Sequence, residues 1–235
     1  MANVYEIIKN DAKLNELLDN VNFRLNELIN FVNKTTGINY SLGCHGKYHA
    51  MYVVKVTEHI LQALCYDEHT IELGKIAGLL HDIGCIYGKF DHARISATMC
   101  AEFWVRTGLS IDDWQVIQQA ILYHSNGENI NSAVGAVLYI ADKIDMSKNR
   151  LISVKEDLKK GGLINEEELN KWDDNSCEIE DIEINISNSI ITFNFLTNSN
   201  PSALRNKYLE HPDKIMEKAC MYLKCSCRYE INGEK

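Results

Sequence analysis

The sequence predicts a mainly α-helical protein with a small α+β part at its C-terminal end. Both prolines of the 235-residue chain lie beyond residue 200, so most of the chain lacks the strongest helix breaker. Apolar residues in this proline-free part recur at helical spacing, whereas near residue 182 they begin to alternate with polar ones, as in a β-strand. We therefore expect a helical domain over residues 1–175 and a small α+β tail over residues 176–235.

Apolar periodicity, combined with start and stop signals, locates the helices of the first part. Ser110 and Asp113 form a capping box at the start of one helix. Gly84 suits the C-terminus of another, and Gly161-Gly162 follows the last. The expected helices cover about residues 7–29, 51–64, 70–84, 110–124, 133–145 and 148–160.

The tail is expected to contain a β-hairpin and two helices. Isoleucines alternate with polar residues from Ile182 to Ile186, and a second run rich in β-formers covers residues 190–196. Pro201 and Pro212 each suit the first turn of a helix. A last short strand is expected at Arg228–Ile231.

The composition is that of a soluble globular protein, with 46% hydrophobic and 24% charged residues. A net charge of −9 argues against non-specific binding to duplex nucleic acid. The longest apolar stretch, Ala133–Ala141, is far shorter than the roughly 20 residues that a membrane-spanning helix needs. Because the N-terminus lacks the features of a signal peptide, we expect a cytoplasmic protein that does not bind membranes.

Eight cysteines are expected to be reduced thiols, because a chain of this length without an export signal does not depend on disulfides. Cys220, Cys225 and Cys227 lie close in sequence and form a candidate metal site. They lack the matching second pair that a typical zinc site contains. We therefore look for the chemistry elsewhere.

The most informative feature is the pair His81-Asp82, which follows the apolar residues Leu79 and Leu80. Burial of an imidazole and a carboxylate costs free energy unless each finds a strong partner. Imidazoles and carboxylates together suit divalent first-row metals. Further candidates lie in, or at the end of, other expected helices, and a helical bundle could bring them together. They are His49, His92, His124 and Asp142.

Six ligands exceed the three protein ligands of a typical mononuclear catalytic site. They suit two metals about 3.5–4 Å apart, with Asp82 as the bridge. His81 and Asp82 would diverge by roughly 100° on a helix, so one can bind a first metal while the other reaches a second. His45 is a rival to His49, but Gly43 and Gly46 indicate a loop there, so we prefer His49.

The ordered pattern of His49, His81-Asp82 and Asp142 resembles the H…HD…D pattern of the HD-domain superfamily of metal-dependent phosphohydrolases. His92 and His124 resemble the extra histidines of its binuclear members. The resemblance covers about residues 45–150. It implies an HD-type helical bundle that holds two divalent metal ions, iron or manganese, with magnesium, zinc, nickel and cobalt as alternatives.

The sequence lacks the characteristic residues of two HD subfamilies, so its resemblance to them is weaker than its resemblance to a third. Cys85 stands where the cyclic-di-GMP phosphodiesterases carry lysine, and the chain lacks their Gly-Tyr-Pro element. Cys85 and Ile86 stand where the stringent-response hydrolases carry Glu-Asp. The run Ala141–Asp145, together with Arg150, is similar to the small bacterial hydrolases that cleave dinucleoside polyphosphates.

The resemblance implies hydrolysis of a nucleotide or another small phosphate ester or anhydride. Two cations would lower the pKa of a bound water and neutralise phosphoryl oxygens. Asp82 would be essential to catalysis, and Lys143, Arg150 and Lys89 are candidates for contact with the phosphate.

Two other functions are open on sequence. Some HD-domain proteins use the same six ligands to hold two irons and activate dioxygen, so a di-iron oxygenase is the main alternative. A sensor with a vestigial site is disfavoured, because all six ligands are present. The basic residues after Asp142 favour phosphate chemistry. The tail is a candidate for substrate gating or for dimerisation, which would make the protein a homodimer.

Overall fold

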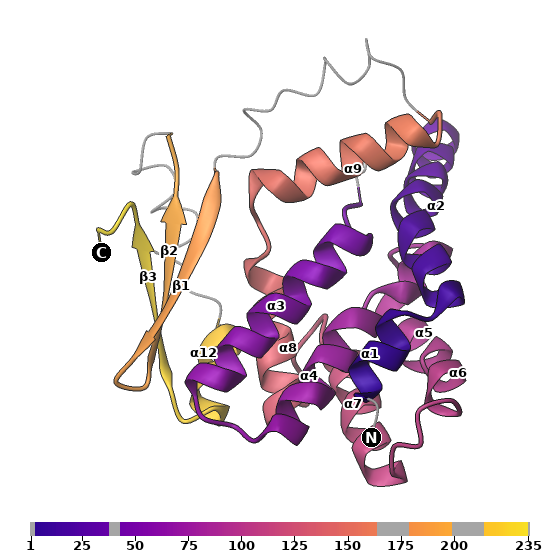
Figure 1. The fold of residues 1–235 in the computed structure, drawn as a ribbon. Coiled ribbons are helices and arrows are strands. Elements are labelled where there is room, and N and C mark those ends of the chain that lie inside the picture. The colour runs from indigo at the N-terminus through magenta and orange to yellow at the C-terminus, as the bar shows by residue number, and fades with distance from the viewer. Residues whose placement is uncertain (1–2, 38–42, 164–178, 199–213, 235) are drawn as a thin grey trace.

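Helices form most of the protein, and a three-stranded sheet lies at one side of them (Figure 1). The computed structural model describes residues 3–37, 43–163, 179–198 and 214–234. This architecture confirms the predicted mainly α class with a small α+β part at the C-terminal end. Among the described helices, none combines the length and apolar character of a membrane-spanning segment.

The N-terminal segment forms two helices, α1 (Val4–Lys9) and α2 (Ala12–Thr36), rather than the single helix expected over residues 7–29. The interruption occurs at Asp11, whose backbone is extended. Its side chain accepts a hydrogen bond from the backbone N–H of Leu14 at 3.0 Å and so caps α2. Aspartate favours such caps because its carboxylate competes for backbone donors inside a helix.

Four helices pack against one another at the centre of the structure. Ser110 caps one of them as predicted: its hydroxyl accepts from the backbone N–H of Asp113 and donates to the carboxylate of that residue. The last of the four is buried from Val134 to Asp142, which is typical of a helix at the centre of a bundle. The four helices are α3 (Lys47–Ala63), α4 (Glu68–Leu80), α7 (Ile111–Tyr123) and α8 (Ala133–Ile144).

The segment between α4 and α7 differs from expectation. Helix α4 ends at Leu80 instead of Gly84, and a 3₁₀-helix, η1 (Ile83–Tyr87), follows it. Two short helices that the sequence did not predict come next, α5 (His92–Met99) and α6 (Ala101–Trp104).

Gly84 allows η1 and α5 to pack in direct backbone contact. A Cβ atom at this position would lie 2.5 Å from the backbone nitrogen of Ser96 and 2.6 Å from the carbonyl oxygen of His92. The backbone N–H of Gly84 instead donates to the Ser96 hydroxyl at 2.8 Å. Contrary to the sequence prediction, Gly84 therefore does not end α4. It allows η1 and α5 to pack closely, and this packing brings His92 to the end of α4.

The tail contains the predicted hairpin. Strand β1 (Asp181–Ser187) pairs antiparallel with β2 (Ile190–Leu196). The two-residue turn Asn188-Ser189 has positive φ at both positions, as a tight hairpin with the twist of its strands requires. Strand β3 (Ser226–Ile231) pairs parallel with β2 and includes the predicted last strand.

Two further helices complete the fold. Helix α9 (Lys148–Lys160) contacts α2, and α12 (Lys214–Tyr222) packs against α8 (Figure 1). Helix α12 follows Pro212 in the sequence, and Pro212 itself, expected in the first turn of this helix, lies outside the described residues. The helix expected after Pro201 lies outside the described residues.

The largest cluster of buried apolar side chains continues from the helices into the sheet and α12. It includes Leu80 and Ile140 from the helical part and Phe193 and Cys220 from the tail. The two parts therefore share buried apolar surface.

This shared core predicts that damage to the sheet destabilises the helices. Phe193 is fully buried, so Phe193→Ala should lower the free energy of unfolding by about 3–5 kcal/mol. Urea denaturation followed by the circular dichroism of the helices measures the change. Phe31 is 65% exposed, and Phe31→Ala is the matched control, with an expected effect within about 0.5 kcal/mol. Unchanged helical unfolding in Phe193→Ala would contradict a common core.

Candidate metal centre

The side chain of Asp82 lies between two pairs of imidazoles. Its Oδ2 atom is 3.3 Å from His49 Nε2 and 3.1 Å from His81 Nε2. Its Oδ1 atom is 3.5 Å from His92 Nε2 and 3.4 Å from His124 Nε2. Each oxygen of this one carboxylate therefore faces a different pair of histidines.

The sixth predicted ligand, Asp142, completes one of these two groups. Its Oδ1 atom is 3.2 Å from His49 Nε2 and 3.8 Å from His81 Nε2. Its Oδ2 atom accepts a hydrogen bond from Lys143 Nζ at 3.0 Å. The structure thus brings all six predicted residues together in two groups that share Asp82. One group is His49, His81, Asp82 and Asp142, and the other is Asp82, His92 and His124.

Helix ends supply most of these side chains. His81 is the residue that follows α4, Asp82 comes next, and His124 follows α7. His92 opens α5. Helices that point their ends at one spot can place several polar groups there without interrupting their own apolar packing.

Backbone carbonyl groups orient three of the imidazoles. A carbonyl oxygen only accepts hydrogen bonds, so the Nδ1 atom of each ring carries a proton, and in the neutral form of the ring Nε2 holds the lone pair that can bind a metal. All three Nε2 atoms face Asp82. Histidines that bind metals are usually held by this kind of hydrogen bond. The bonds run from His81 Nδ1 to Gly78 O at 2.8 Å, from His92 Nδ1 to Lys89 O at 2.8 Å, and from His124 Nδ1 to Ile121 O at 2.6 Å.

A carboxylate orients the fourth imidazole. His49 Nδ1 lies 2.6 Å from Oδ2 of Asp145, which is fully buried. Asp145 was not among the site residues predicted from the sequence, although it lies only three residues after Asp142, at the C-terminal end of α8. Its role depends on His49, 96 residues away, and no local pattern reports such a contact.

The site is anionic at its centre. Burial alone would raise the pKa of Asp82, but the imidazoles of His81 and His45 hold it well below its usual range. Burial opposes ionisation of Asp142 too, and the hydrogen bond with His49 and the charge of Lys143 outweigh it, so that its pKa is also well below the usual range. Two ionised, buried carboxylates among imidazoles attract positive charge.

The pKa of His49 is raised by these carboxylates. Burial and the nearby Arg150 lower its pKa, yet hydrogen bonds to Asp142, Asp145 and Asp82 outweigh both and raise the pKa to about 10. The donor set and its charge therefore fit divalent cations.

His45 also reaches the centre. His49 was predicted as a ligand in preference to His45, but both histidines contact Asp82 in the structure, with His45 Nδ1 2.6 Å from Asp82 Oδ2. His45 lies in the loop before α3, as the flanking glycines indicated. Cys85, from η1, approaches the other oxygen of Asp82, and its thiol is 3.6 Å from Oδ1. Burial raises the pKa of Cys85 well above its usual value, so this group is a neutral thiol.

Side chains from distant helices fix the loop that carries His45. The side-chain oxygen of Asn22 accepts from the backbone N–H of His45 at 2.8 Å. Asn26, fully buried in α2, exchanges two hydrogen bonds with the backbone of Gly43. Arg150 Nε donates to the carbonyl oxygen of Cys44 at 2.7 Å. The loop is thus held by both α2 and α9.

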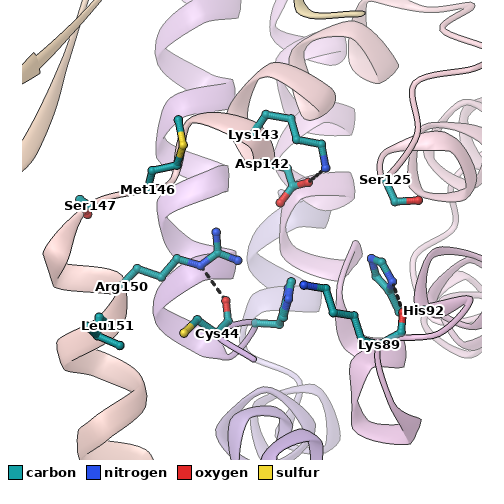
Figure 2. Close-up of a pocket in the computed structure, with 11 residues that line it drawn as sticks. Cys44, Lys89, His92, Ser125, Asp142, Lys143, Met146, Ser147, Arg150 and Leu151 are labelled. Atoms are coloured by element: carbon teal, nitrogen blue, oxygen red, sulfur yellow. Dashed lines mark hydrogen bonds and ion pairs between the residues drawn. The ribbon is translucent and has the colours of Figure 1, made fainter. Parts of the chain in front are cut away.

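A pocket of about 570 Å³ opens beside Asp142 and His92. Three positively charged side chains line it: Lys89, Lys143 and Arg150. Figure 2 shows Lys89 and Arg150 approaching the pocket from opposite sides. The local charge at this mouth is therefore opposite in sign to the net charge of the chain, and it suits an anion.

The three cations differ in their other contacts. Arg150 is partly engaged by carbonyl oxygens, those of Cys44 and of Asp145. Lys143 bonds to Asp142 (Figure 2). Within the described part of the chain, the exposed ammonium group of Lys89 has neither an ion-pair nor a hydrogen-bond partner. Lys89 is therefore the one most available to a ligand.

Other candidate ligands lie away from the centre. His69 forms a surface pair with Asp113, and His59 contacts the carbonyl oxygen of Ile184. Cys220 and Cys225 are buried free thiols. Over the described ranges, every group of side chains close enough to hold a metal contains Asp82.

A helical bundle that gathers imidazoles and carboxylates at helix ends is a metal-binding helical domain. Residues 47–147 match the family model of the HD domain. This match to the HD domain confirms the resemblance inferred from His49, His81-Asp82 and Asp142.

The chain is also similar to the crystal structure of a predicted HD superfamily hydrolase from an uncultured Thermotogales bacterium. The two are 19% identical, the similarity covers 72% of this chain and 98% of the other, and the TM-score is 0.43. No curated protein matches the chain.

Divalent metal should stabilise the folded protein through Asp82. A ligand that binds only the native state adds about 2.7 kcal/mol at a hundred times its dissociation constant. Adding Mn²⁺ to the metal-free protein should therefore raise the midpoint of thermal unfolding, and Asp82→Asn should abolish the shift. His69→Gln removes a surface imidazole and should leave it intact. An equal shift in Asp82→Asn and wild type would exclude Asp82 as a ligand.

Asp145 should tune metal affinity through His49. Loss of a carboxylate that orients a metal-binding histidine typically weakens binding about 10- to 100-fold. We expect a decrease of that size in Asp145→Asn, measured by competition with a chromophoric chelator. Asp113→Asn is the matched control, because Asp113 bonds to His69 at 2.7 Å on the surface. If both variants bind metal like wild type, Asp145 has no such role.

Proposed function

We propose that this protein is a metal-dependent phosphohydrolase that acts on a nucleotide or another small phosphate ester or anhydride. The observation that carries the proposal is the position of Asp82, whose two oxygens each face a separate pair of histidines beside a cation-lined pocket. A cation-lined pocket suits a phosphate, and the match of residues 47–147 to the HD domain supports the same chemistry.

Two divalent metals fit the ligand set. One would be held by His49, His81, Asp82 and Asp142, and the other by Asp82, His92 and His124. Nitrogen and carboxylate donors suit iron or manganese, with magnesium, zinc, nickel and cobalt as alternatives. When bound, such cations lower the pKa of a water molecule and neutralise charge on phosphoryl oxygens.

The side chains of the pocket have separable roles in this reaction. Lys89 is exposed and unpaired among the described residues, so it can bind a phosphate directly. Arg150 presents a guanidinium group, which matches phosphate oxygens in a planar, bidentate way. Lys143 neutralises Asp142 and lines the pocket, so that the carboxylate repels the phosphate less. Together they bind and orient the substrate.

The site also has the ligands of a di-iron oxygenase, the main alternative. The same donors can hold two irons, because hydrolases and oxygenases can share a ligand set and differ in the metal and in the open coordination positions. The three cations at the pocket favour phosphate over an uncharged substrate. Measurement of metal content and oxygen consumption separates the two functions.

Hydrolysis should depend on metal and on Asp82. Protein purified without oxygen is mixed with nucleotides, and phosphate release is measured with iron, manganese or magnesium. We expect release that stops with a chelator, resumes with metal and falls to background in Asp82→Ala. His59→Ala is a control, because this exposed histidine lies outside the cluster. Two irons per chain with oxygen consumption and no phosphate release would instead indicate the oxygenase.

A further inference from the structure

A second pocket adjoins the cation-lined one. It has a volume of about 640 Å³. Three residues line both pockets: Lys89, His92 and Ser125. Figure 2 shows these three along one side of the first pocket. A ligand in the first pocket can therefore extend past them into the second.

The second pocket is built differently from the first. Phe90, from the loop between η1 and α5, and Leu122 and Tyr123, from the last turn of α7, line it. None of these three lines the first pocket. A ligand that spans both pockets thus meets the three cations of the first pocket and the aromatic side chains of Phe90 and Tyr123 in the second, which Asp91 and Arg94 also line.

Phe90 is the most exposed large apolar side chain of the described residues, at 93%. Its loop has positive φ at Gly88 and at Asp91 on either side of it. Asp91 forms an ion pair with Arg94, which ties the loop to the first turn of α5. The loop thus carries two exposed residues at consecutive positions, Lys89 and Phe90, and both line the second pocket.

We infer that the second pocket binds the nucleobase of a nucleotide whose phosphate groups lie in the first pocket. The inference rests on the proposed function and specifies its substrate as a nucleotide. Aromatic side chains stack on any base, because every base has a π-face. The volumes of the two pockets lie within the usual range for small-molecule sites.

Asn126 supplies a polar group for the edge of the base. It lines the second pocket, and its side-chain oxygen accepts from the backbone N–H of Glu128 at 3.2 Å. This bond fixes which way the amide points and leaves its NH₂ group to donate. Stacking on Phe90 therefore supplies affinity, and Asn126 a preference among bases.

Binding of non-hydrolysable nucleotides tests the inference. The probes are the α,β-methylene diphosphates of adenosine, guanosine, cytidine and uridine, with methylenediphosphonate as the same anion without a nucleoside. Isothermal titration calorimetry on the metal-loaded protein measures each dissociation constant. At least one nucleoside probe should bind about tenfold more tightly than methylenediphosphonate, a gain typical of stacking on an aromatic side chain.

The same titrations on variants assign this gain to Phe90. Phe90→Ala should remove most of it and leave methylenediphosphonate binding unchanged, whereas Phe90→Tyr should retain it. Val105→Ala, at a position that is 82% exposed and lines neither pocket, should behave like wild type. The inference is overturned if no nucleoside probe binds more tightly than methylenediphosphonate, or if Phe90→Ala keeps the full gain.

These outcomes are separate from those for the proposed function. If phosphate release depends on metal but the nucleoside probes bind no more tightly than methylenediphosphonate, the hydrolase proposal is supported and the nucleobase pocket is refuted. Phe90-dependent binding of a nucleoside probe without any hydrolysis would do the reverse.

Discussion

The buried carboxylate of Asp82 is the constraint on which the rest of the site depends. It is 2% exposed, and an isolated ion at such a position would cost several kcal/mol. Imidazoles from α3, α4, α5, α7 and the loop before α3 offset that cost. Those elements must therefore end at one point, and the apolar bundle behind them holds them there. Gly84 serves the same convergence, since a side chain there would push α5 and His92 away.

Polar groups around the centre are organised in layers. Carbonyl oxygens and Asp145 set the ring orientations of the four predicted histidine ligands. Asn22, Asn26 and Arg150 hold the loop that brings His45 to Asp82. Arg150 thus has a structural role and a place in the pocket wall, so its loss would affect both. Of the cations at the pocket, Lys89 is the one whose removal isolates an effect on ligand binding.

Much of the fold and the ligand set could be predicted, for different physical reasons. The central helices carry long apolar periods and clear caps, such as Ser110 before α7. His81-Asp82 stands out because two polar residues interrupt an apolar run. Helices α5 and α6 were missed because segments of eight and four residues carry too short a period. The break at Asp11 was not predicted because the apolar pattern continues across it. The helix is interrupted there because the Asp11 side chain caps α2 and its own backbone is extended.

The sequence by itself determined the helical class, the hairpin and the six side chains of the cluster, Asp82 included, because local periodicity and residue chemistry can be read along the chain. Only the tertiary structure decided that His45 joins them, that Asp145 orients His49, and that Phe90 lines a second pocket together with Leu122 and Tyr123. These depend on contacts between segments far apart in the chain, such as the 96 residues between His49 and Asp145. Such contacts depend on how the whole bundle packs, so they cannot be predicted from a short stretch of sequence.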